Sequence, residues 1–550
     1  MTLKLTQVAL LCSAALMLGG CSFGKSDNEC EVCTPCPECE EDDSGSQTPP
    51  LTEPEISTEK TFNETLVLAD ASEATVTVTT VAAFIEAIKD AKPGDVIALA
   101  DGDYELGELS ISASVIGTAA QPITLRAENE GQVVFTSSVD TPTMLTINGD
   151  YVHVRGFVWQ DPTPSTSSSD GAVILKGNHN HFINNTMVGS GYGYDENCDP
   201  QDIKWVTLDG QDHVVSHNRF EGKCGKGVLL TVKRTIERED RHHIHHNIFK
   251  DYVPNWDDDN GFETLRIGTS KDSQYDSSSV VEYNLFERTN GEIEVISNKS
   301  GNNTYRYNTL RNSDGLLTIR HGKNATIEYN VFLQSGSNAG GGIRMFDSSH
   351  TVRHNYIEGV DTSSNSRGGI VIHAGINAQG SGDPEGDALL NKQWTANTLT
   401  IENNTIYESR QGIFHNAYMG SSNCNGESGS VDCQSAWGVS FNNNVVHAEG
   451  TSEGVAVTLG AGTLVADGRY QNEYYYGRQG TGFEGSDFDS DSNIITAKQT
   501  FPQSTNANTK GLWQPSTTAA GAGADFNQLL VLEEDDAFLG PNYRYLPSSN

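Results

Sequence analysis

Two carboxylates, an amine and a guanidinium are spaced so that together they could move protons around an acidic substrate. Glu292 and Glu294 stand at positions i and i+2, which places both side chains on one face of a β-strand. Lys299 follows the second glutamate by five residues and precedes Arg320 by 21. If the chain coils with a period near 21 residues, Lys299 and Arg320 become neighbours on adjacent rungs. The four groups then form a candidate cation site beside groups able to accept and donate protons.

A repeat along the chain predicts the coil that would bring these residues together. The pattern Asn-x-hydrophobic recurs with a shortest interval of 22–25 residues and some longer steps, which is typical of a solenoid with loop insertions. No helical period of comparable length appears, and short β-rich runs precede the asparagines. We therefore expect an all-β fold, a single-stranded right-handed parallel β-helix, with asparagine side chains stacked from rung to rung. The repeated asparagines are Asn185, Asn218, Asn247, Asn284, Asn308, Asn330, Asn355, Asn404 and Asn444.

The first 20 residues predict a lipoprotein signal peptide. Lys4 precedes an apolar run, and the sequence Leu-Gly-Gly-Cys ending at Cys21 looks like a bacterial lipobox, which implies lipidation of that cysteine. Ser22 at the next position fits sorting to the outer membrane. A plain secreted signal peptide is the alternative.

Residues 21–64 predict a disordered acidic tether, because they combine high charge with low hydrophobicity. Cys30, Cys33, Cys36 and Cys39 lie there, and an oxidising compartment favours disulfides over an iron–sulfur cluster. Farther on, Cys198 with Cys224 and Cys424 with Cys433 are expected to pair and pin long loops. The β-helix domain is expected over residues 65–550. An amphipathic helix over residues 80–91 is expected to cap its first rung, with Val81, Phe84, Ile85 and Ile88 facing the coil.

The distribution of charge points to an acidic polymer as the partner. The chain has a net charge of −38, which excludes nucleic acid as the default partner. Its few basic residues gather near the candidate site. Strand alternation places Arg266, Arg320 and Arg344 opposite apolar neighbours, so we expect them to project outward beside the carboxylates. A positive cleft on a negative body would select a polyanion.

A uronate polysaccharide is the substrate class that fits such a cleft. Its C5 proton becomes removable when the neighbouring carboxylate is neutralised by fixed charges or a metal. Calcium suits that task because it takes hard oxygen ligands and keeps open positions. Glu292 and Glu294 supply two ligands, and Asn260 is a candidate third. A lysine acts as a base only when deprotonated, whereas an arginine stays charged and is expected to stabilise or relay.

Three runs of sequence resemble polysaccharide lyase family 6, which contains alginate lyases and chondroitinase B. They span residues 260–270, 291–300 and 315–322. The resemblance implies a right-handed parallel β-helix that performs calcium-assisted β-elimination. It also implies Lys299 as the Brønsted base, Arg320 as the Brønsted acid, Glu292 and Glu294 as calcium ligands, and Asn260 as a third ligand.

Four further residues are candidates for contact with the substrate. They are Arg266, His321, Arg344 and His373. For Arg344 the alternative is a structural pair with Asp347, and for His321 it is a role in bracing the loop.

The histidine run over residues 242–246 is a second candidate metal site. Alternation puts His243 and His245 on one face, but no carboxylate stands at a matching spacing in the sequence. The run is therefore expected to be structural.

We expect the chain to be an alginate lyase that is lipid-anchored at the outer membrane. A chondroitin or dermatan sulfate lyase is the first alternative, although a sulfated substrate would favour more arginines than this chain provides. A non-catalytic carbohydrate-binding β-helix is the second. A β-helix glycosidase of the polygalacturonase type would need aspartates clustered on successive rungs, whereas Asp257, Asp258 and Asp259 lie together in one loop.

Overall fold

The computed structural model describes most of the chain after residue 72. The described residues are 73–137, 143–162, 170–189, 202–234, 238–252, 260–337, 339–362, 367–376, 393–417, 433–448, 454–459, 468–479, 494–496, 499–516, 521–536 and 538–541. The predicted signal peptide, Cys21, the tether, Cys198 and Cys424 lie outside them, so the lipid anchor and the disulfides stay predictions. The described residues belong to one compact unit. No helix among them is both long and apolar enough to cross a membrane.

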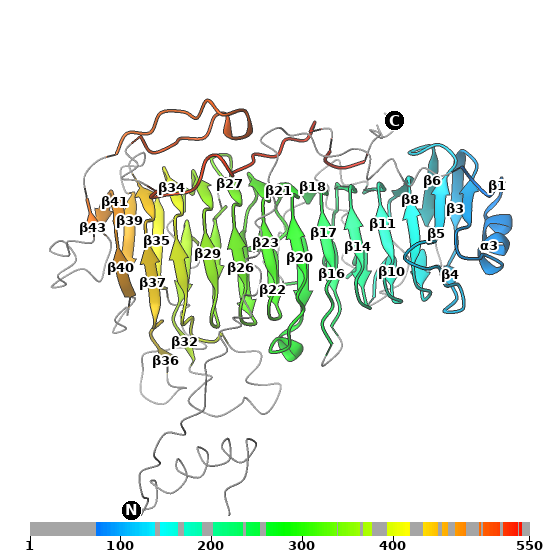
Figure 1. Cartoon of the computed structure of the whole chain (residues 1–550), viewed down its shortest axis with the longest axis horizontal. Coiled ribbons are helices and arrows are strands. Elements are labelled where there is room, and N and C mark those ends of the chain that lie inside the picture. Colours follow the sequence, from blue (N-terminus) through cyan, green and yellow to red (C-terminus); the bar gives the residue numbers. More distant parts are fainter. Residues whose placement is uncertain are drawn as a thin grey trace, which may run out of the picture. The chain divides into compact units, whose positions relative to one another are not determined.

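Three parallel sheets, called A, B and C below, build a right-handed parallel β-helix, and each rung contributes one strand to each sheet (Figure 1). The fold class predicted from the asparagine repeat is therefore confirmed. Sheet A contains β1 (Val76–Val78), β2 (Val96–Leu99), β5 (Ile123–Ala127), β8 (Val152–Arg155), β11 (His181–Ile183), β14 (Val214–Ser216), β17 (His243–His245), β20 (Val280–Glu282), β23 (Thr304–Arg306), β26 (Thr326–Glu328), β29 (Thr351–Arg353), β33 (Thr400–Glu402), β37 (Val439–Asn442) and β40 (Gly468–Gln471).

Sheets B and C complete the rungs. Sheet B contains β3 (Gly102–Leu106), β6 (Val133–Ser137), β9 (Phe157–Gln160), β12 (Thr186–Val188), β15 (Arg219–Glu221), β18 (Ile248–Tyr252), β21 (Leu285–Thr289), β24 (Thr309–Arg311), β27 (Val331–Leu333), β30 (Tyr356–Glu358), β34 (Thr405–Tyr407), β38 (Val445–His447), β41 (Glu473–Tyr476) and β43 (Ile494–Ile495). Sheet C contains β4 (Leu109–Ile111), β7 (Leu145–Ile147), β10 (Val173–Leu175), β13 (Val206–Leu208), β16 (Leu230–Val232), β19 (Leu265–Gly268), β22 (Glu294–Lys299), β25 (Leu316–His321), β28 (Ile343–Met345), β31 (Ile370–His373), β35 (Gln411–Ala417), β39 (Val455–Leu459) and β42 (Arg478–Gln479).

The remaining described elements are short. β32 (Gly375–Ile376) and β36 (Cys433–Gln434) form an antiparallel pair. Two 3₁₀ turns, η2 (Ser270–Asp272) and η4 (Ala507–Thr509), lie in connections.

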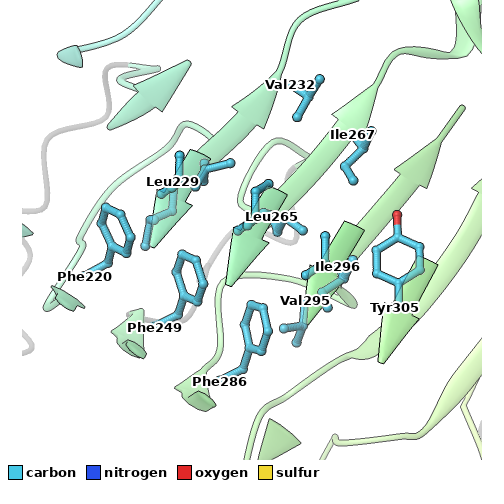
Figure 2. Close-up of a cluster of buried hydrophobic side chains, with 14 of the residues drawn as sticks. Phe220, Leu229, Val232, Phe249, Leu265, Ile267, Phe286, Val295, Ile296 and Tyr305 are labelled. Atoms are coloured by element: carbon cyan, nitrogen blue, oxygen red, sulfur yellow. The ribbon is translucent and has the colours of Figure 1, made fainter. Parts of the chain in front are cut away.

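The interior of the coil is a continuous column of stacked apolar side chains, because apolar residues alternate with polar ones along most strands. Figure 2 shows Phe220, Phe249 and Phe286 in register on three successive rungs. Their ring centroids are 5.0 and 4.8 Å apart and each pair lies within 10° of parallel. Adjacent rungs are about 4.8 Å apart, so such stacking requires the same residue type at the same place in each rung.

The predicted asparagine ladder is present. In each step from Asn185 to Asn444, the backbone N–H of one asparagine donates to Oδ1 of the next. The side-chain amide donates to that oxygen and to a backbone carbonyl of the preceding rung, as Asn308 does to Asn330 and Val281. Glu473 ends the ladder by accepting both bonds from Asn444. The polar groups of the buried turn thereby find hydrogen-bond partners within the protein.

Helix α3 (Val81–Lys89) covers the first rung, as expected. Thr80 caps it by accepting a hydrogen bond from the amide of Ala83. Phe84 and Ile88 are buried in the core, and Val81 and Ile85 pack against it. The helix closes the open end of the apolar column at the blue end of Figure 1.

A stack of rings follows the outer edge between sheets A and B. His217, His246, Tyr283, Tyr307, Tyr329 and His354 lie on successive rungs with centroids 4.9–5.1 Å apart. The C-terminal segment, drawn in orange to red in Figure 1, packs over part of it through Leu529, Val531 and Phe538. Glu533 holds this segment by a bidentate ion pair with Arg311 at 2.7 and 2.8 Å.

Candidate active site

The predicted site residues come together on sheet C, where β19, β22, β25 and β28 lie side by side. The register aligns Arg266, Ser297, Thr318 and Arg344 in one row across these four strands. Leu265, Ile267, Ile319 and Met345, which flank members of this row, belong to the apolar core. Alternation therefore directs the row away from the core, as the sequence predicts.

Two bulges between β22 and β25 modify the predicted geometry. One shift in register falls between Glu294 and Ile296, so Val295 and Ile296 both enter the core. The other falls after Asn298 and pairs Lys299 with His321. Lys299 and Arg320 therefore lie on adjacent rungs but are offset by one residue, because the bulge leaves Arg320 outside the regular pairing.

Three carboxylates converge beside this row. One oxygen atom from each of Glu263, Glu292 and Glu294 lies within 4.8 Å of the others. Oε2 of Glu292 accepts the amides of Gly261 and Phe262 at 3.1 and 3.3 Å. Burial, together with the charges of Glu263 and Glu294, raises the pKa of Glu292 to about 8. A cluster of this kind is stabilised by a cation.

Glu263 is the member of the cluster that sequence reasoning missed. It is fully buried, and its Oε2 has no hydrogen-bond partner among the residues that the structure describes. Alternation from Leu265 would have placed Glu263 on the core side, but β19 begins only at Leu265, so the rule fails there. The signal in the sequence that could have identified Glu263 is its position three residues after the candidate ligand Asn260.

Glu294 is held by cations. Its Oε1 lies 2.5 Å from Nη2 of Arg344 and 3.8 Å from Nε of Arg320, and its Oε2 accepts from Ser297 at 2.5 Å. Burial alone would raise the pKa of Glu294, but the charges of Arg344, Lys299 and Arg320 outweigh it and lower that pKa. The predicted alternative for Arg344, a pair with Asp347, is wrong; Asp347 instead accepts the amide of Gly322 at 3.0 Å.

Lys299 reaches into the carboxylate cluster. Its Nζ is 3.4 Å from Oε1 of Glu263, and Nη1 of Arg266 is 3.5 Å from the same atom. Gly268 pairs with Lys299 across the rungs and has a φ of +82°. A Cβ at Gly268 would lie 2.6 Å from the carbonyl oxygen of Lys299, so only glycine fits beside the lysine.

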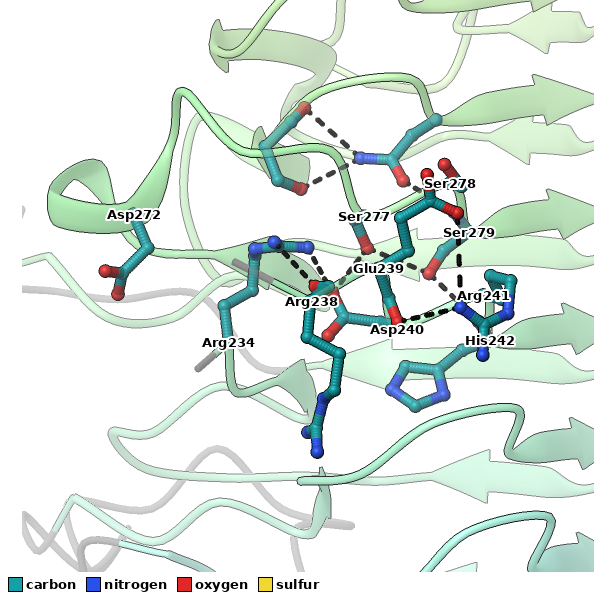
Figure 3. Close-up of polar contacts among 12 residues, drawn as sticks. Arg234, Arg238, Glu239, Asp240, Arg241, His242, Asp272, Ser277, Ser278 and Ser279 are labelled. Atoms are coloured by element: carbon teal, nitrogen blue, oxygen red, sulfur yellow. Dashed lines mark hydrogen bonds and ion pairs between the residues drawn. The ribbon is translucent and has the colours of Figure 1, made fainter. Parts of the chain in front are cut away.

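A buried ion pair fixes the connection that follows β16, next to Gly268. Arg234 donates to Asp240 across 2.5 Å, and both side chains are fully buried. Ser277 donates to the same carboxylate oxygen at 2.7 Å (Figure 3). Because Cδ of Arg234 would lie 3.1 Å from a Cβ at Gly268, the pair braces the rung before Lys299.

Phe346 organises the far side of the site. The guanidinium carbons of Arg320 and Arg344 lie 5.4 and 5.7 Å from the centre of its ring. His373, predicted to face outward, lies opposite the core residues Ile370 and Ile372 and stacks on Phe346 at 4.2 Å, but it is fully buried. The irregularity beside it falls in β35, where Asn416 is the extra residue, so the alternation along β31 holds while neighbouring residues cover the imidazole.

His321 and Asn260 occupy different surroundings. His321 is 1% exposed, so in the structure it lies under its neighbours rather than on an open surface. Burial and the charges of Arg320 and Lys299 hold its pKa well below the ordinary value, which keeps the imidazole neutral. Asn260 is exposed and directly precedes the two amides that bind Glu292. Its role as a ligand stays a prediction.

Comparisons with known proteins give matches in both sequence and structure. The sequence matches the family model of chondroitinase B over residues 78–405. A PL6 alginate lyase solved with a trisaccharide is 30% identical, has a TM-score of 0.71, and aligns over 86% of this chain and 95% of its own. Alginate lyase AlyF-OU02, solved with G6, is 29% identical with a TM-score of 0.69, over 88% of this chain and 98% of its own.

A third structure differs in length. The PL6 alginate lyase AlyGC is 27% identical with a TM-score of 0.69 over 86% of this chain, but the match spans only 59% of AlyGC. A search of curated proteins returned no match to the sequence.

Proposed function

Because the chain belongs to the chondroitinase B family, polysaccharide lyase family 6, we propose that it cleaves alginate by calcium-assisted β-elimination. That the chain is a polysaccharide lyase follows from the family. The observation that carries the finer proposal is the cluster of Glu263, Glu292 and Glu294 in contact with Lys299 and Arg320.

Lys299 and Arg320 supply the proton chemistry in this proposal. Lys299, as the neutral amine, takes the C5 proton of the uronate. The electron pair of that C–H bond forms the C4–C5 double bond while the bond from C4 to O4 breaks. Arg320 gives a proton to the departing O4. Burial lowers the pKa of Arg320 against the opposing charge of Glu294, which favours this donation.

The donor set of the carboxylate cluster fits calcium. Carboxylate oxygens are the ligands that calcium prefers, and within the described part of the chain Oε2 of Glu263 is buried without a hydrogen-bond partner. When bound, calcium would neutralise the substrate carboxylate and so stabilise negative charge that develops at C5. Glu263, Glu292 and Glu294 would hold the ion, with Asn260 as the further ligand predicted from the sequence.

Alginate is favoured over a sulfated polymer for two reasons. Two similar structures that align over most of both chains are described as alginate lyases. The chain also has only 35 basic residues against 73 acidic ones, and the arginines of the site are engaged by glutamates. A sulfated substrate would require additional cations in the groove.

The test is an assay of the chain on alginate, chondroitin sulfate and dermatan sulfate. A lyase produces an unsaturated uronate that absorbs in the ultraviolet, a hydrolase releases reducing ends without that absorbance, and a binding protein does neither. We expect absorbance with alginate, its loss on calcium chelation, and its restoration by added calcium.

Lys299→Ala is expected to abolish turnover while its circular dichroism stays that of the parent chain. Lys323→Ala, a lysine two residues beyond His321 with a partly exposed side chain, is the matched control and should retain turnover. Turnover that survives in Lys299→Ala would show that the base is assigned wrongly. Absorbance with dermatan sulfate but not with alginate would show that the substrate is the sulfated polymer.

A further inference from the structure

The histidine run over residues 242–246 gains from the next rung the carboxylate that its sequence lacks. In β17, His243 and His245 flank the buried Ile244, so both imidazoles lie on the outer face of sheet A. His245 pairs in register with Glu282 of β20. Nε2 of His243 lies 2.6 Å from Oε1 of Glu282, and the centroids of the two imidazoles are 4.0 Å apart. The expectation that this run has no carboxylate partner is therefore wrong.

Arg306 on the following rung orients the carboxylate. Its Nε donates to Oε2 of Glu282 at 2.6 Å, which leaves Oε1 directed at His243. Glu282 is therefore an oxygen donor held by a second residue, the arrangement found around bound metals.

His246 orients the second imidazole. It is stacked between His217 at 4.9 Å and Tyr283 at 5.0 Å, and its Nδ1 lies 2.7 Å from Nδ1 of His245. In the tautomer in which His245 donates from Nδ1, its Nε2 carries a lone pair available to a metal.

We propose that His243, His245 and Glu282 bind a borderline divalent transition metal such as Zn²⁺ on the outer face of sheet A. Two imidazoles and a carboxylate are a donor set that such metals prefer over calcium. The side chain of His243 is 41% exposed, so solvent can reach the site and complete the coordination. This site lies on a different sheet from the carboxylate cluster and is independent of the proposed lyase chemistry.

Binding requires the three side chains to rearrange, because their ligand atoms do not yet all lie within 4.8 Å of one another. Ligand atoms around a tetrahedral zinc ion lie about 3.3 Å apart, so the pair between His243 and Glu282 opens slightly from 2.6 Å and its shared proton passes to solvent. The imidazole of His245 turns to present Nε2. The ion then links β17 to β20.

The test is calorimetric titration of Zn²⁺ into the full chain in buffer containing calcium. We expect one saturable site, and a weakening of at least about 10-fold in both His243→Ala and Glu282→Gln. His179→Ala is the matched control, since His179 is a surface histidine 3.7 Å from Asp212 and outside the cluster. Glu292→Gln, which alters the carboxylate cluster, should also leave zinc binding unchanged.

A second readout guards against a folding defect. Zinc should raise the unfolding temperature of the parent chain and of His179→Ala, because a ligand of the native state stabilises it, but not that of His243→Ala. Co²⁺ should give visible absorption bands that His245→Ala removes. Absence of saturable zinc binding would show that His243, like Arg306, serves only as a structural partner of Glu282. Equal affinity in His243→Ala and His179→Ala would likewise overturn the proposal.

Discussion

Arg344 and Glu294, which stand two rungs apart on sheet C, form a buried ion pair with 2.5 Å between Nη2 and Oε1. Their side chains are 3% and 8% exposed, so water screens the pair little. Arg320 approaches the same oxygen at 3.8 Å. Glu294 thus connects the cations of the site to the carboxylate cluster. The occupancy of a cation site and the stability of the fold are therefore coupled through this one side chain.

Removal of Arg344 tests that coupling. In Arg344→Ala, Glu294 remains buried without its principal partner, so we expect a loss of about 3–5 kcal/mol in the free energy of unfolding without calcium. A bound divalent ion would replace the missing positive charge. Calcium should therefore stabilise the variant more than it stabilises the parent chain. Urea unfolding with calcium and with chelator measures both effects.

Arg353→Ala is the control for this prediction, because Arg353 pairs with Glu328 at 2.7 Å but is 37% exposed. Its loss should cost at most about 1 kcal/mol, with no added dependence on calcium. If calcium stabilised Arg344→Ala and the parent chain equally, Glu294 would not be part of the cation site.

The asparagine ladder should respond strongly to the loss of one member. Asn308→Ala removes bonds to Val281 and Asn330 and leaves the amide of Asn284 buried without its acceptor. We expect a loss of about 1–3 kcal/mol in unfolding free energy, measured by urea denaturation. Asn129→Ala, in which an exposed asparagine loses its bond to Asp101, should change stability by less than about 0.5 kcal/mol. Similar losses in both variants would mean that the ladder adds nothing beyond an ordinary turn.

Glu473 makes stability depend on pH at the end of that ladder. Burial raises its pKa from 4.5 to about 8 in the folded chain, whereas the unfolded chain keeps the ordinary value. The folded state therefore holds more protons than the unfolded state in this window. The contribution of Glu473 to stability is fully present below pH 4.5. It falls as the pH rises towards about 8, by up to about 1.4 kcal/mol of unfolding free energy per pH unit.

Glu473→Gln should remove that fall, since the amide oxygen still accepts from Asn444 but does not ionise. The measurement is the unfolding free energy of parent and variant across the window, compared with Glu402→Gln, a partly exposed residue of β33. Parallel pH profiles for parent and Glu473→Gln would assign the dependence to another group.

The repeat in the sequence was sufficient to predict the coil, because the asparagines and the stacked core residues obey a local rule that every rung repeats. It also placed Glu292, Glu294, Lys299 and Arg320 in one neighbourhood. Strand alternation failed wherever the pairing is irregular. A bulge displaced Arg320 from its expected register, and no periodicity marks where such a bulge falls. His373 keeps its predicted direction opposite the core but is covered by neighbouring residues, which alternation does not reveal either.

Contacts between distant residues were the other limit. Glu282 lies 39 residues beyond His243, and an insertion between the two rungs hides that they are neighbours. The C-terminal segment carries no repeat that shows which rungs it covers. Its ion pair between Glu533 and Arg311 spans 222 residues.

The identity of the third ligand gives the sharpest comparison between sequence and structure. The sequence predicts Asn260, whereas Glu263 places an oxygen within 4.8 Å of the other two carboxylates. If the structure is right, Glu263→Gln weakens calcium binding by about 10-fold or more, since a charged ligand is lost. Asn260→Ala should then have a smaller effect.

Calorimetric titration of calcium into each variant distinguishes the two ligands without a substrate. Glu263→Gln also removes a partner of Lys299 and Arg266, so turnover should fall further than calcium occupancy alone explains. Turnover at saturating calcium measures that additional loss. A larger loss of calcium affinity in Asn260→Ala than in Glu263→Gln would restore the prediction from the sequence and leave Glu263 as the residue that positions Lys299.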